Sequence, residues 1–355
     1  MTPEPAPPGT LPARPVRIGI TLGDVTGVGP EVIAAALRDL RTSDAAAPTD
    51  PPPVEFVLYG DAAWWDRACR MRLGSDSAAL HDRLAVGGLG VQLIPPLTDP
   101  LPVDLPPGDP RAARAAVAWL EAAGRACLRG ELDAIVTGPV NKAAIQRAGI
   151  PFTGQTEFLA ALAGEPEPVM MLLGPDEHDR WLRVALATVH IALREVPSRL
   201  SVARVLRAIA CARQACLQLR LPRARVAVCG LNPHCGEGGA FGDEEPRLIE
   251  PAVREARQHG WDVVGPLSGD TVFHHALQGR FDAVVAMYHD QGLAPLKAVA
   301  FDRGVNWSLG LPFIRTSPDH GTAYDIAGRG LADPGSMRAA IELARQLAGY
   351  RLAGG

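Results

Sequence analysis

Short apolar runs alternate with amphipathic stretches along most of this chain. The runs have the length and the β-branched content of buried strands, and turns rich in Gly, Pro, Asn or Asp follow them. Expected strands cover residues 16–22, 54–59, 134–136, 183–188, 226–229 and 283–287. The alternation predicts an α/β protein built on a largely parallel, doubly wound sheet.

Helix start signals agree with this pattern. Pro30 and Pro110 each stand where the first turn of a helix is expected, and Asp109 precedes the second of them as an N-cap. Glu31 has the charge that the N-terminal end of a helix dipole favours. Expected helices cover residues 30–37, 109–129, 198–219, 243–259 and 334–348.

Length and composition bound the function. A chain of 355 residues is long for one core and suits two domains. A formal net charge of -4 excludes a general attraction to nucleic acid or to anionic membranes, so a bound anion needs local donors. No apolar run approaches the roughly 18–20 residues of a membrane span. The Pro-rich N-terminus lacks an apolar signal core, which predicts a cytoplasmic protein.

Residues 281–315 hold the densest set of candidate functional groups. His289 follows a buried strand, at the end where ligands bind in open α/β sheets. Lys297, Asn306 and Arg315 come next, each among apolar residues. Arg offers a fork that matches a carboxylate or phosphate, and Lys offers a movable point charge. The three donors therefore form a candidate anion site, although each alone would more often be a surface residue.

Three histidines share one context. His190, His234 and His289 each lie just past the end of an expected buried strand. A parallel sheet brings such ends to one edge, where three imidazoles could bind a divalent ion and leave a position open for substrate. The alternative is three separate polar loop residues or acid–base groups.

Other candidates have a structural alternative of similar weight. Asp270 could be a base or the N-cap of a helix that starts at Thr271. The Gly-rich turn at 23–31 could face a ligand or be a tight turn before a capped helix. The turn at 137–142 suits phosphate, and a capped turn explains it almost as well. Motifs of covalent nucleophiles are absent, which disfavours covalent catalysis.

Several segments together resemble the 4-hydroxythreonine-4-phosphate dehydrogenase family of the pyridoxal phosphate pathway. They are GDVTGVGPE (23–31), TGPVNK (137–142), GQTEF (154–158), GLNPHCGEGG (230–239), YHDQGLAPLK (288–297) and RGVNWSLGLPFIRTSPDHGTA (303–323). The closing HGTAYDIAGRG also resembles the loop of isopropylmalate and isocitrate dehydrogenases that contacts the adenosine end of NAD(P).

The resemblance implies an isocitrate/isopropylmalate dehydrogenase-like fold with two α/β/α domains. Residues 1–15 would be a disordered lead-in. Residues 16–145 with 305–355 would form the first domain, and 146–304 a second domain with the metal site and the dimer interface. The family implies a homodimer whose active site lies between the domains and is shared with the partner subunit.

The resemblance also implies a reaction, the metal-dependent oxidation of 4-(phosphooxy)-L-threonine with NAD(P). The β-keto acid product loses CO2 to give 3-amino-2-oxopropyl phosphate. The implied metal ligands, for Zn²⁺, Mg²⁺ or Co²⁺, are His190, His234 and His289. The implied substrate-binding residues are Gln155, Thr156, Lys297, Asn306 and Arg315, with Asp270 and Lys297 in catalysis. The implied cofactor-binding residues are His320, Gly321, Thr322 and Asp325.

One departure bears on the substrate. Gln155 stands where the family pattern GHTEF has histidine, and an amide cannot carry a proton charge. Threonate or erythronate 4-phosphate, or a dihydrodiol dicarboxylate, therefore stay open as substrates. A phosphotransacetylase-like acyltransferase is the alternative from another class, against which the three histidines and the HGTA loop argue. Cys235, beside His234, could offer a thiolate to the metal or be a bystander.

Overall fold

A computed structural model describes residues 14–44, 53–74, 77–80, 89–94, 100–165 and 167–353. The expected disordered lead-in, 1–15, lies outside this part except at its last two residues. The chain divides into two compact units, residues 1–168 with 311–355 (unit 1) and residues 169–310 (unit 2). Within the described residues no helix is both long and apolar enough to cross a membrane.

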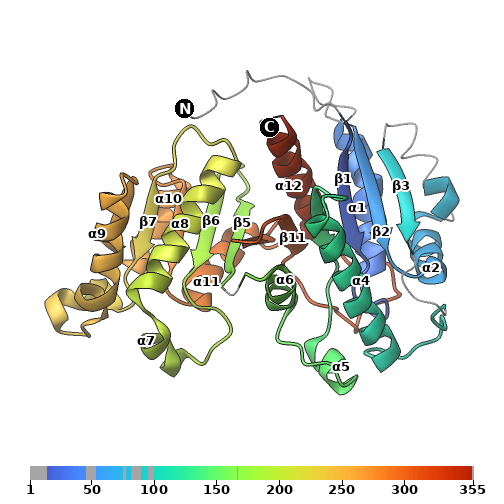
Figure 1. Cartoon of the computed structure of the whole chain (residues 1–355), viewed down its shortest axis with the longest axis horizontal. Helices are drawn as coiled ribbons and strands as arrows, with labels where there is room; N and C mark the ends of the chain where they lie inside the picture. The colour runs from blue at the N-terminus through green and yellow to red at the C-terminus, as the bar shows by residue number, and fades with distance from the viewer. Residues whose placement is uncertain are drawn as a thin grey trace. The chain divides into compact units, whose positions relative to one another are not determined.

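Unit 1 is built on a parallel sheet in the order β3-β2-β1-β4-β11 (Figure 1 labels β1 to β3, in blue to cyan, and β11, in red). Its strands are β1 (Val16–Thr21), β2 (Val54–Tyr59), β3 (Leu89–Ile94), β4 (Ala134–Thr137) and β11 (Ile314–Pro318). Its helices are α1 (Gly29–Asp44), α2 (Ala62–Leu73), α4 (Pro110–Leu128), α5 (Lys142–Arg147), α6 (Gln155–Ala163) and α12 (Gly335–Leu352). The parallel strands bring the loops after β1, β4 and β11 to one edge.

Local sequence signals account for the main helix of unit 1. The side chain of Asp109 caps α4 by accepting from the backbone N–H of Arg111, with Pro110 in the first turn. Its apolar face buries Trp119 and Leu120. The helix packs against β1, β2 and β4, while α12 packs against β1, β4 and β11.

Unit 2 has a mixed sheet in the order β10-β5-β6-β9-β7-β8. Strand β5 runs antiparallel to both neighbours, and the remaining pairs are parallel. The strands are β5 (Val169–Pro175), β6 (Trp181–Leu186), β7 (Val226–Cys229), β8 (Val263–Leu267), β9 (Ala283–Ala286) and β10 (Val305–Leu309). The α-helices are α7 (Val196–Arg199), α8 (Val202–Gln218), α9 (Glu250–Gln258), α10 (Gly269–Leu277) and α11 (His289–Ala300) (Figure 1, yellow and orange).

Side chains that alternate along the strands fill the core of unit 2. Leu182, Val184 and Leu186 of β6 pack in one cluster with residues of α10 and α11. The buried stripe of α8, which includes Val205 and Ile209, packs on the same sheet. Period-two alternation along the strands thus sets which residues enter the cluster.

The units divide the chain at other positions than expected. The expected second domain began at 146, but α6 packs against α4 of unit 1. A Cβ on Gly124 would lie only 2.8 Å from a methyl of Leu159, so these helices pack closely and keep α6 in unit 1. Residues 305–309 fall in unit 2 because β10 pairs with β5.

Two expected helices are interrupted. The helix expected at 198–219 is split at Leu200, and Ser201 caps α8 by accepting from the N–H of Arg204. The helix expected at 243–259 starts with a π-helical turn, Glu245–Ile249, before α9.

Candidate functional site

Three Gly-rich loops meet at the strand-end edge of unit 1. The N–H of Asp24, after β1, donates to the carbonyl of Pro139, after β4, at 2.9 Å. The N–H of Val28 donates to the carbonyl of Thr322, after β11, also at 2.9 Å. Gly23 has a φ of 71°, and a Cβ there would lie 2.3 Å from the Pro139 oxygen, so only glycine permits this approach. The three loops therefore pack against one another at this edge of the sheet.

Acidic side chains fix two of these loops. Buried Asp24 accepts a 2.6 Å hydrogen bond from the hydroxyl of Tyr324, and burial with this contact raises the pKa of the tyrosine. Glu31, only 2% exposed, accepts from the N–H groups of Gly328 and Gly330 at 3.1 and 3.0 Å. The expected dipole role of Glu31 thus accompanies a second one, fixing the segment after β11.

Arg315 lies fully buried on β11 and donates to two hydroxyl groups. Its Nε and Nη2 donate to Oγ1 of Thr137 at 3.1 and 2.7 Å, and its Nη1 donates to Oγ1 of Thr156 at 3.1 Å. Burial lowers the pKa of Arg315 to about 10, so the guanidinium keeps its charge at neutral pH. The charge of Glu157 opposes this effect of burial on the pKa of Arg315. A buried cation whose hydrogen bonds go to neutral hydroxyls is suited to an anionic ligand.

Gln155 lies next to this cluster. It is the first residue of α6, and its Nε2 donates to the carbonyl of Gly138 at 3.1 Å. Its Oε1 is buried and has no hydrogen-bond partner among the described residues. The structure thus brings Gln155, Thr156 and Arg315 together, all three expected to bind substrate.

The turn at 137–142 has a structural role as well. The side chain of Asn141 caps α5 by accepting from the N–H of Ala144 at 3.0 Å. This agrees with the capped-turn interpretation for Asn141. Thr137 and Gly138 of the same turn contact Arg315 and Gln155, so the start of the turn belongs to the candidate site.

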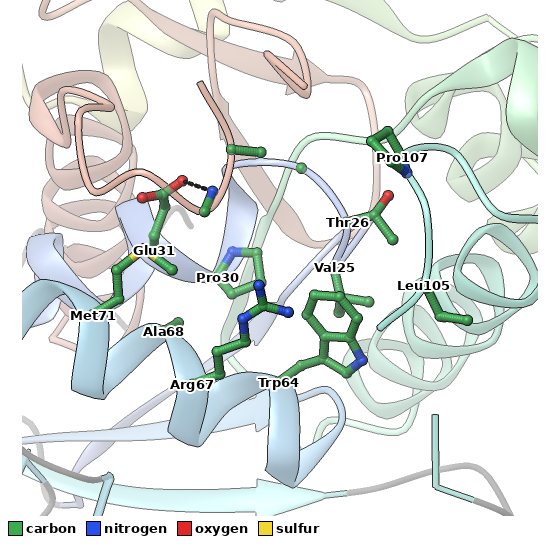
Figure 2. Close-up of a pocket in the computed structure, with 13 residues that line it drawn as sticks. Val25, Thr26, Pro30, Glu31, Trp64, Arg67, Ala68, Met71, Leu105 and Pro107 are labelled. Atoms are coloured by element: carbon green, nitrogen blue, oxygen red, sulfur yellow. Dashed lines mark hydrogen bonds between the residues drawn. The ribbon is translucent and has the colours of Figure 1, made fainter. Parts of the chain in front are cut away.

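A pocket opens beside the Gly-rich loops of unit 1 (Figure 2). Apolar side chains, including Trp64, Met71 and Leu105, line most of it, and the Arg67 guanidinium lies 5.2 Å from the Trp64 ring centroid. Ala327 and Gly328, from the segment after β11, complete the lining. The pocket combines an aromatic wall with one exposed cation.

The expected cofactor residues lie at the same edge. His320 Nδ1 donates to the Gly321 carbonyl at 2.9 Å, and its Nε2 is buried without a partner among the described residues. Thr322 is buried, whereas Gly321 and Asp325 are exposed.

In unit 2, the ends of β6 and β9 bring two histidines side by side. The ring centroids of His190 and His289 lie 5.4 Å apart. Thr188 connects the two strand ends, because its hydroxyl donates to the Met287 carbonyl at 2.7 Å. Nδ1 of His289 donates to the carboxylate of Asp290 at 2.7 Å, which leaves Nε2 as the ring atom available to a metal.

His234 lies in a strained loop, Pro233–Gly239. His234, Cys235 and Glu237 all have positive φ, at 50°, 57° and 42°. Buried Glu245 holds the base of this loop, accepting from the N–H groups of Leu231 and Asn232. Nδ1 of His234 donates to Glu237 at 2.8 Å, so this histidine also has a carboxylate partner and an available Nε2.

The donor set matches a divalent metal in kind. Imidazoles whose second nitrogen donates to a carboxylate are common metal ligands. Within the residues described, however, no group of three or more His, Cys, Asp or Glu side chains is arranged around a single point. Within this chain His190 and His289 therefore lie close together, and His234 does not complete a set of three with them.

Gln291 joins the strand ends in unit 2. Its Oε1 accepts from the N–H of Met287 and its Nε2 donates to the carbonyl of Gly230, both at 2.7 Å. The helix of His289 is thereby tied to the strand that precedes the His234 loop. Gln291 was not singled out from the sequence, since only the fold reveals its two backbone partners.

The remaining candidates of unit 2 differ in exposure, since Asp270 is exposed and Lys297, Asn306 and Cys235 are partly buried. Asp270 lies in the first turn of α10 and is exposed, and Ser268 holds the N-cap, so the cap interpretation of Asp270 is wrong. Lys297 lies in the last turn of α11, with its Nζ 5.2 Å from the ring centroid of Phe301. Asn306 on β10 has a buried Oδ1 without a partner among the described residues. Burial, then Glu245 and Asp270, raise the pKa of Cys235.

Comparison with known proteins gives consistent similarities. The model of the family described as "Pyridoxal phosphate biosynthetic protein PdxA" matches residues 55–344. A 4-hydroxythreonine-4-phosphate dehydrogenase of Geobacter metallireducens is 46% identical over 352 residues, which cover 97% of this chain and 99% of the relative.

Solved structures agree. A crystal structure of 4-hydroxythreonine-4-phosphate dehydrogenase from Klebsiella pneumoniae is 37% identical with a TM-score of 0.75, covering 94% of this chain and 99% of that one. A terephthalate 1,2-cis-dihydrodiol dehydrogenase from Burkholderia xenovorans is 30% identical with a TM-score of 0.63, covering 94% and 98%. An isocitrate dehydrogenase from Methylococcus capsulatus shares the fold at 15% identity, with a TM-score of 0.51, covering 96% and 87%.

Proposed function

Because the chain belongs to the pyridoxal phosphate biosynthetic protein PdxA family, we propose that it is an NAD(P)-dependent 4-hydroxythreonine-4-phosphate dehydrogenase. It would oxidise 4-(phosphooxy)-L-threonine at C3 to a β-keto acid, which loses CO2 to give 3-amino-2-oxopropyl phosphate. This reaction lies in pyridoxal phosphate biosynthesis. The expected fold class and enzyme class are confirmed by the relatives.

The observation that carries this proposal is the buried Arg315 with its two threonine partners. A small dianionic or trianionic substrate needs charge-assisted donors in a site that excludes water. Arg315 supplies the charge. The hydroxyls of Thr137 and Thr156 accept from Arg315 and hold the guanidinium in a fixed orientation. We assign an anionic group of the substrate to these donors, with Lys297 and Asn306 as its further ligands.

We assign the binding of a divalent ion, Zn²⁺, Mg²⁺ or Co²⁺, to His190, His289 and His234. When bound, the ion supplies a Lewis acid for the C3 oxygen, and the nicotinamide supplies the hydride acceptor. Asp290 and Glu237 bind Nδ1 of His289 and His234, which leaves Nε2 of each ring for the ion. Asp270 and Lys297 are the groups that we assign to proton transfer in the oxidation and the decarboxylation.

We further propose a homodimer in which His234 comes from a second copy. His190 and His289 lie side by side, while His234 forms no group of three with them. A ligand contributed across a two-fold axis would complete both sites of a dimer by symmetry. The strained backbone of the His234 loop agrees with a functional role, because strain of this kind clusters at ligand sites.

The adenosine end of the cofactor is assigned to His320, Gly321, Thr322 and Asp325. The pocket of Figure 2 lies against the same segment, and its aromatic wall and Arg67 suit a nucleobase with an attached phosphate. Glu31 supports this assignment, because it fixes Gly328 and Gly330 at the end of the segment.

The direct test is NAD(P)H absorbance with 4-(phosphooxy)-L-threonine and with threonate 4-phosphate, before and after treatment with a chelator. We expect turnover of the threonine derivative that chelation abolishes and added divalent metal restores. Turnover that survives thorough metal removal would refute the metal assignment. Activity on threonate 4-phosphate alone would refute the substrate and leave the dehydrogenase class standing.

A further inference from the structure

The amide of Gln155 has an orientation that its surroundings dictate. The neighbour at 3.1 Å is the carbonyl oxygen of Gly138, which can only accept a hydrogen bond. The amide nitrogen must therefore face Gly138, and Oε1 must point away from it. Position 155 consequently offers an acceptor, whereas a protonated histidine at the same position would offer a donor.

That acceptor is unpaired. Oε1 of Gln155 is buried and has no hydrogen-bond partner among the described residues. A buried oxygen without a partner is unfavourable, and a donor that enters the site with a ligand removes the cost. The adjacent residue, Thr156, belongs to the Arg315 cluster, whose buried guanidinium favours an anion. The site thus presents donors for an anion and, one residue away along α6, an acceptor.

The chemistry of the substrate limits which group can meet this acceptor. The carboxylate has no proton near pH 7, and the phosphate keeps little of its last proton, whose pKa is about 6. The C3 hydroxyl is the group that is oxidised, and its proton passes to one of the groups assigned above to proton transfer. The substituent at C2 is the remaining donor, an ammonium in 4-(phosphooxy)-L-threonine or a hydroxyl in a threonate.

We propose, building on the function proposed above, that Gln155 Oε1 accepts a hydrogen bond from the C2 substituent and makes position 155 a specificity determinant. The residue then selects for a donor at C2 and does not bind the phosphate. A glutamine can do this at any pH, because its amide does not titrate.

The test compares two substrates in two enzymes. The substrates are 4-(phosphooxy)-L-threonine and 3-hydroxy-4-(phosphooxy)butanoate, which lacks the C2 donor. The enzymes are the unmodified chain and Gln155→Met. We expect the Gln155→Met substitution to lower kcat/KM about 10- to 100-fold for the threonine derivative and less than about 3-fold for the butanoate.

Gln146→Met is the matched control. Gln146 also donates its amide Nε2 to a backbone carbonyl of unit 1, that of Phe152, at 2.9 Å. Its loss removes the same kind of bond away from the Arg315 cluster, and kcat/KM should stay within about 3-fold for both substrates.

Gln155→His adds a readout that a structural role would not change. A neutral imidazole can accept from the C2 donor, but an imidazolium cannot, so kcat/KM of this variant should fall below about pH 6.5. This fall of kcat/KM at acidic pH, measured relative to the unmodified chain, should occur with the threonine derivative and be absent with the butanoate.

The outcomes separate the two proposals. An equal loss on both substrates in Gln155→Met would overturn the inference, since it would indicate a structural or water-mediated role. If the unmodified chain neither oxidises the threonine derivative nor binds it in calorimetry, the proposed function fails and the inference fails with it. If the unmodified chain turns over the threonine derivative but Gln155→Met affects both substrates alike, the inference is refuted and the proposed function stands.

Discussion

Arg315 is the residue on which we expect substrate binding to depend most. Its guanidinium is fully buried, keeps its charge, and makes hydrogen bonds with three nitrogens to two hydroxyls that belong to other elements. Thr137 and Thr156 lie 178 and 159 residues away in the chain. The planar fork is what permits all three bonds at once.

Arg315→Lys should therefore be a severe change even though it keeps the charge. An ammonium cannot reach both hydroxyls in the same geometry, so we expect kcat/KM for 4-(phosphooxy)-L-threonine to fall about 100-fold, mostly through KM. Arg183→Lys is the matched control, because burial also lowers the pKa of Arg183, which lies on β6 of unit 2. A control loss as large as that of Arg315→Lys would contradict the special role.

Residue types at the site were predictable from the sequence, but their contacts were not. Arg315 and Gln155 stand out by residue type and motif, yet their partners are set by which strands and helices meet. Thr137 begins the turn at 137–142 that the sequence indicates as suited to phosphate, but its contact with Arg315 depends on the pairing of β4 with β11. Asp24 and Gln291 act through buried backbone and hydroxyl partners, and the local pattern has no signal for such partners.

At the scale of elements, the Gly-rich loops of unit 1 are held by buried carboxylates. Glu31 is the clearest case, because each of its oxygens accepts from one backbone N–H of the segment after β11. This connection joins the first helix of the chain to the expected cofactor loop, 297 residues away.

Glu31→Gln should weaken that connection. The amide NH2 would face a backbone N–H, so one hydrogen bond is lost and a buried donor is left unpaired. We expect a loss of about 2 kcal/mol in the free energy of unfolding, together with a higher KM for NAD(P). Urea unfolding and initial-rate kinetics measure the two effects.

Glu121→Gln is the control for this change. Glu121 forms an exposed pair with Arg125 one turn along α4, and such pairs contribute little. A change below about 0.5 kcal/mol is expected. Equal destabilisation by the two substitutions would show that the Glu31 contacts are not special.

Strands with strong apolar runs were predictable, and weakly patterned elements were not. Val54–Tyr59 and Val226–Cys229 have the expected bounds because a β-branched run is followed by a turn signal. Strand β3 and helix α2 were missed, since Gly residues and charged positions interrupt their patterns. The break at Leu200 depends on Ser201 capping α8, a local competition that periodicity does not reveal.

At the scale of the whole molecule, the placement of the three histidines bears most directly on the proposed metal site. The strand-end rule correctly brought His190 and His289 together, and it failed to bring His234 to the same point within the chain. The loop of His234 uses left-handed backbone at non-glycine residues, which no sequence pattern predicts.

Mixing two inactive variants tests the dimer proposal. His234→Ala keeps His190 and His289, and His289→Ala keeps His234. If His234 comes from a second copy, each mixed dimer regains one intact site, so random mixing should restore about a quarter of full activity. If all three ligands come from one chain, no mixed dimer has an intact site, and activity should stay at background.

The central claim is that this chain carries out an oxidative decarboxylation of 4-(phosphooxy)-L-threonine. Its most direct test is to follow NAD(P)H and labelled CO2 together, using substrate labelled at C1. We predict one molecule of CO2 for each NAD(P)H formed, with both signals lost on metal removal. NAD(P)H without CO2, or no reaction with this substrate while another hydroxy acid is oxidised, would contradict it.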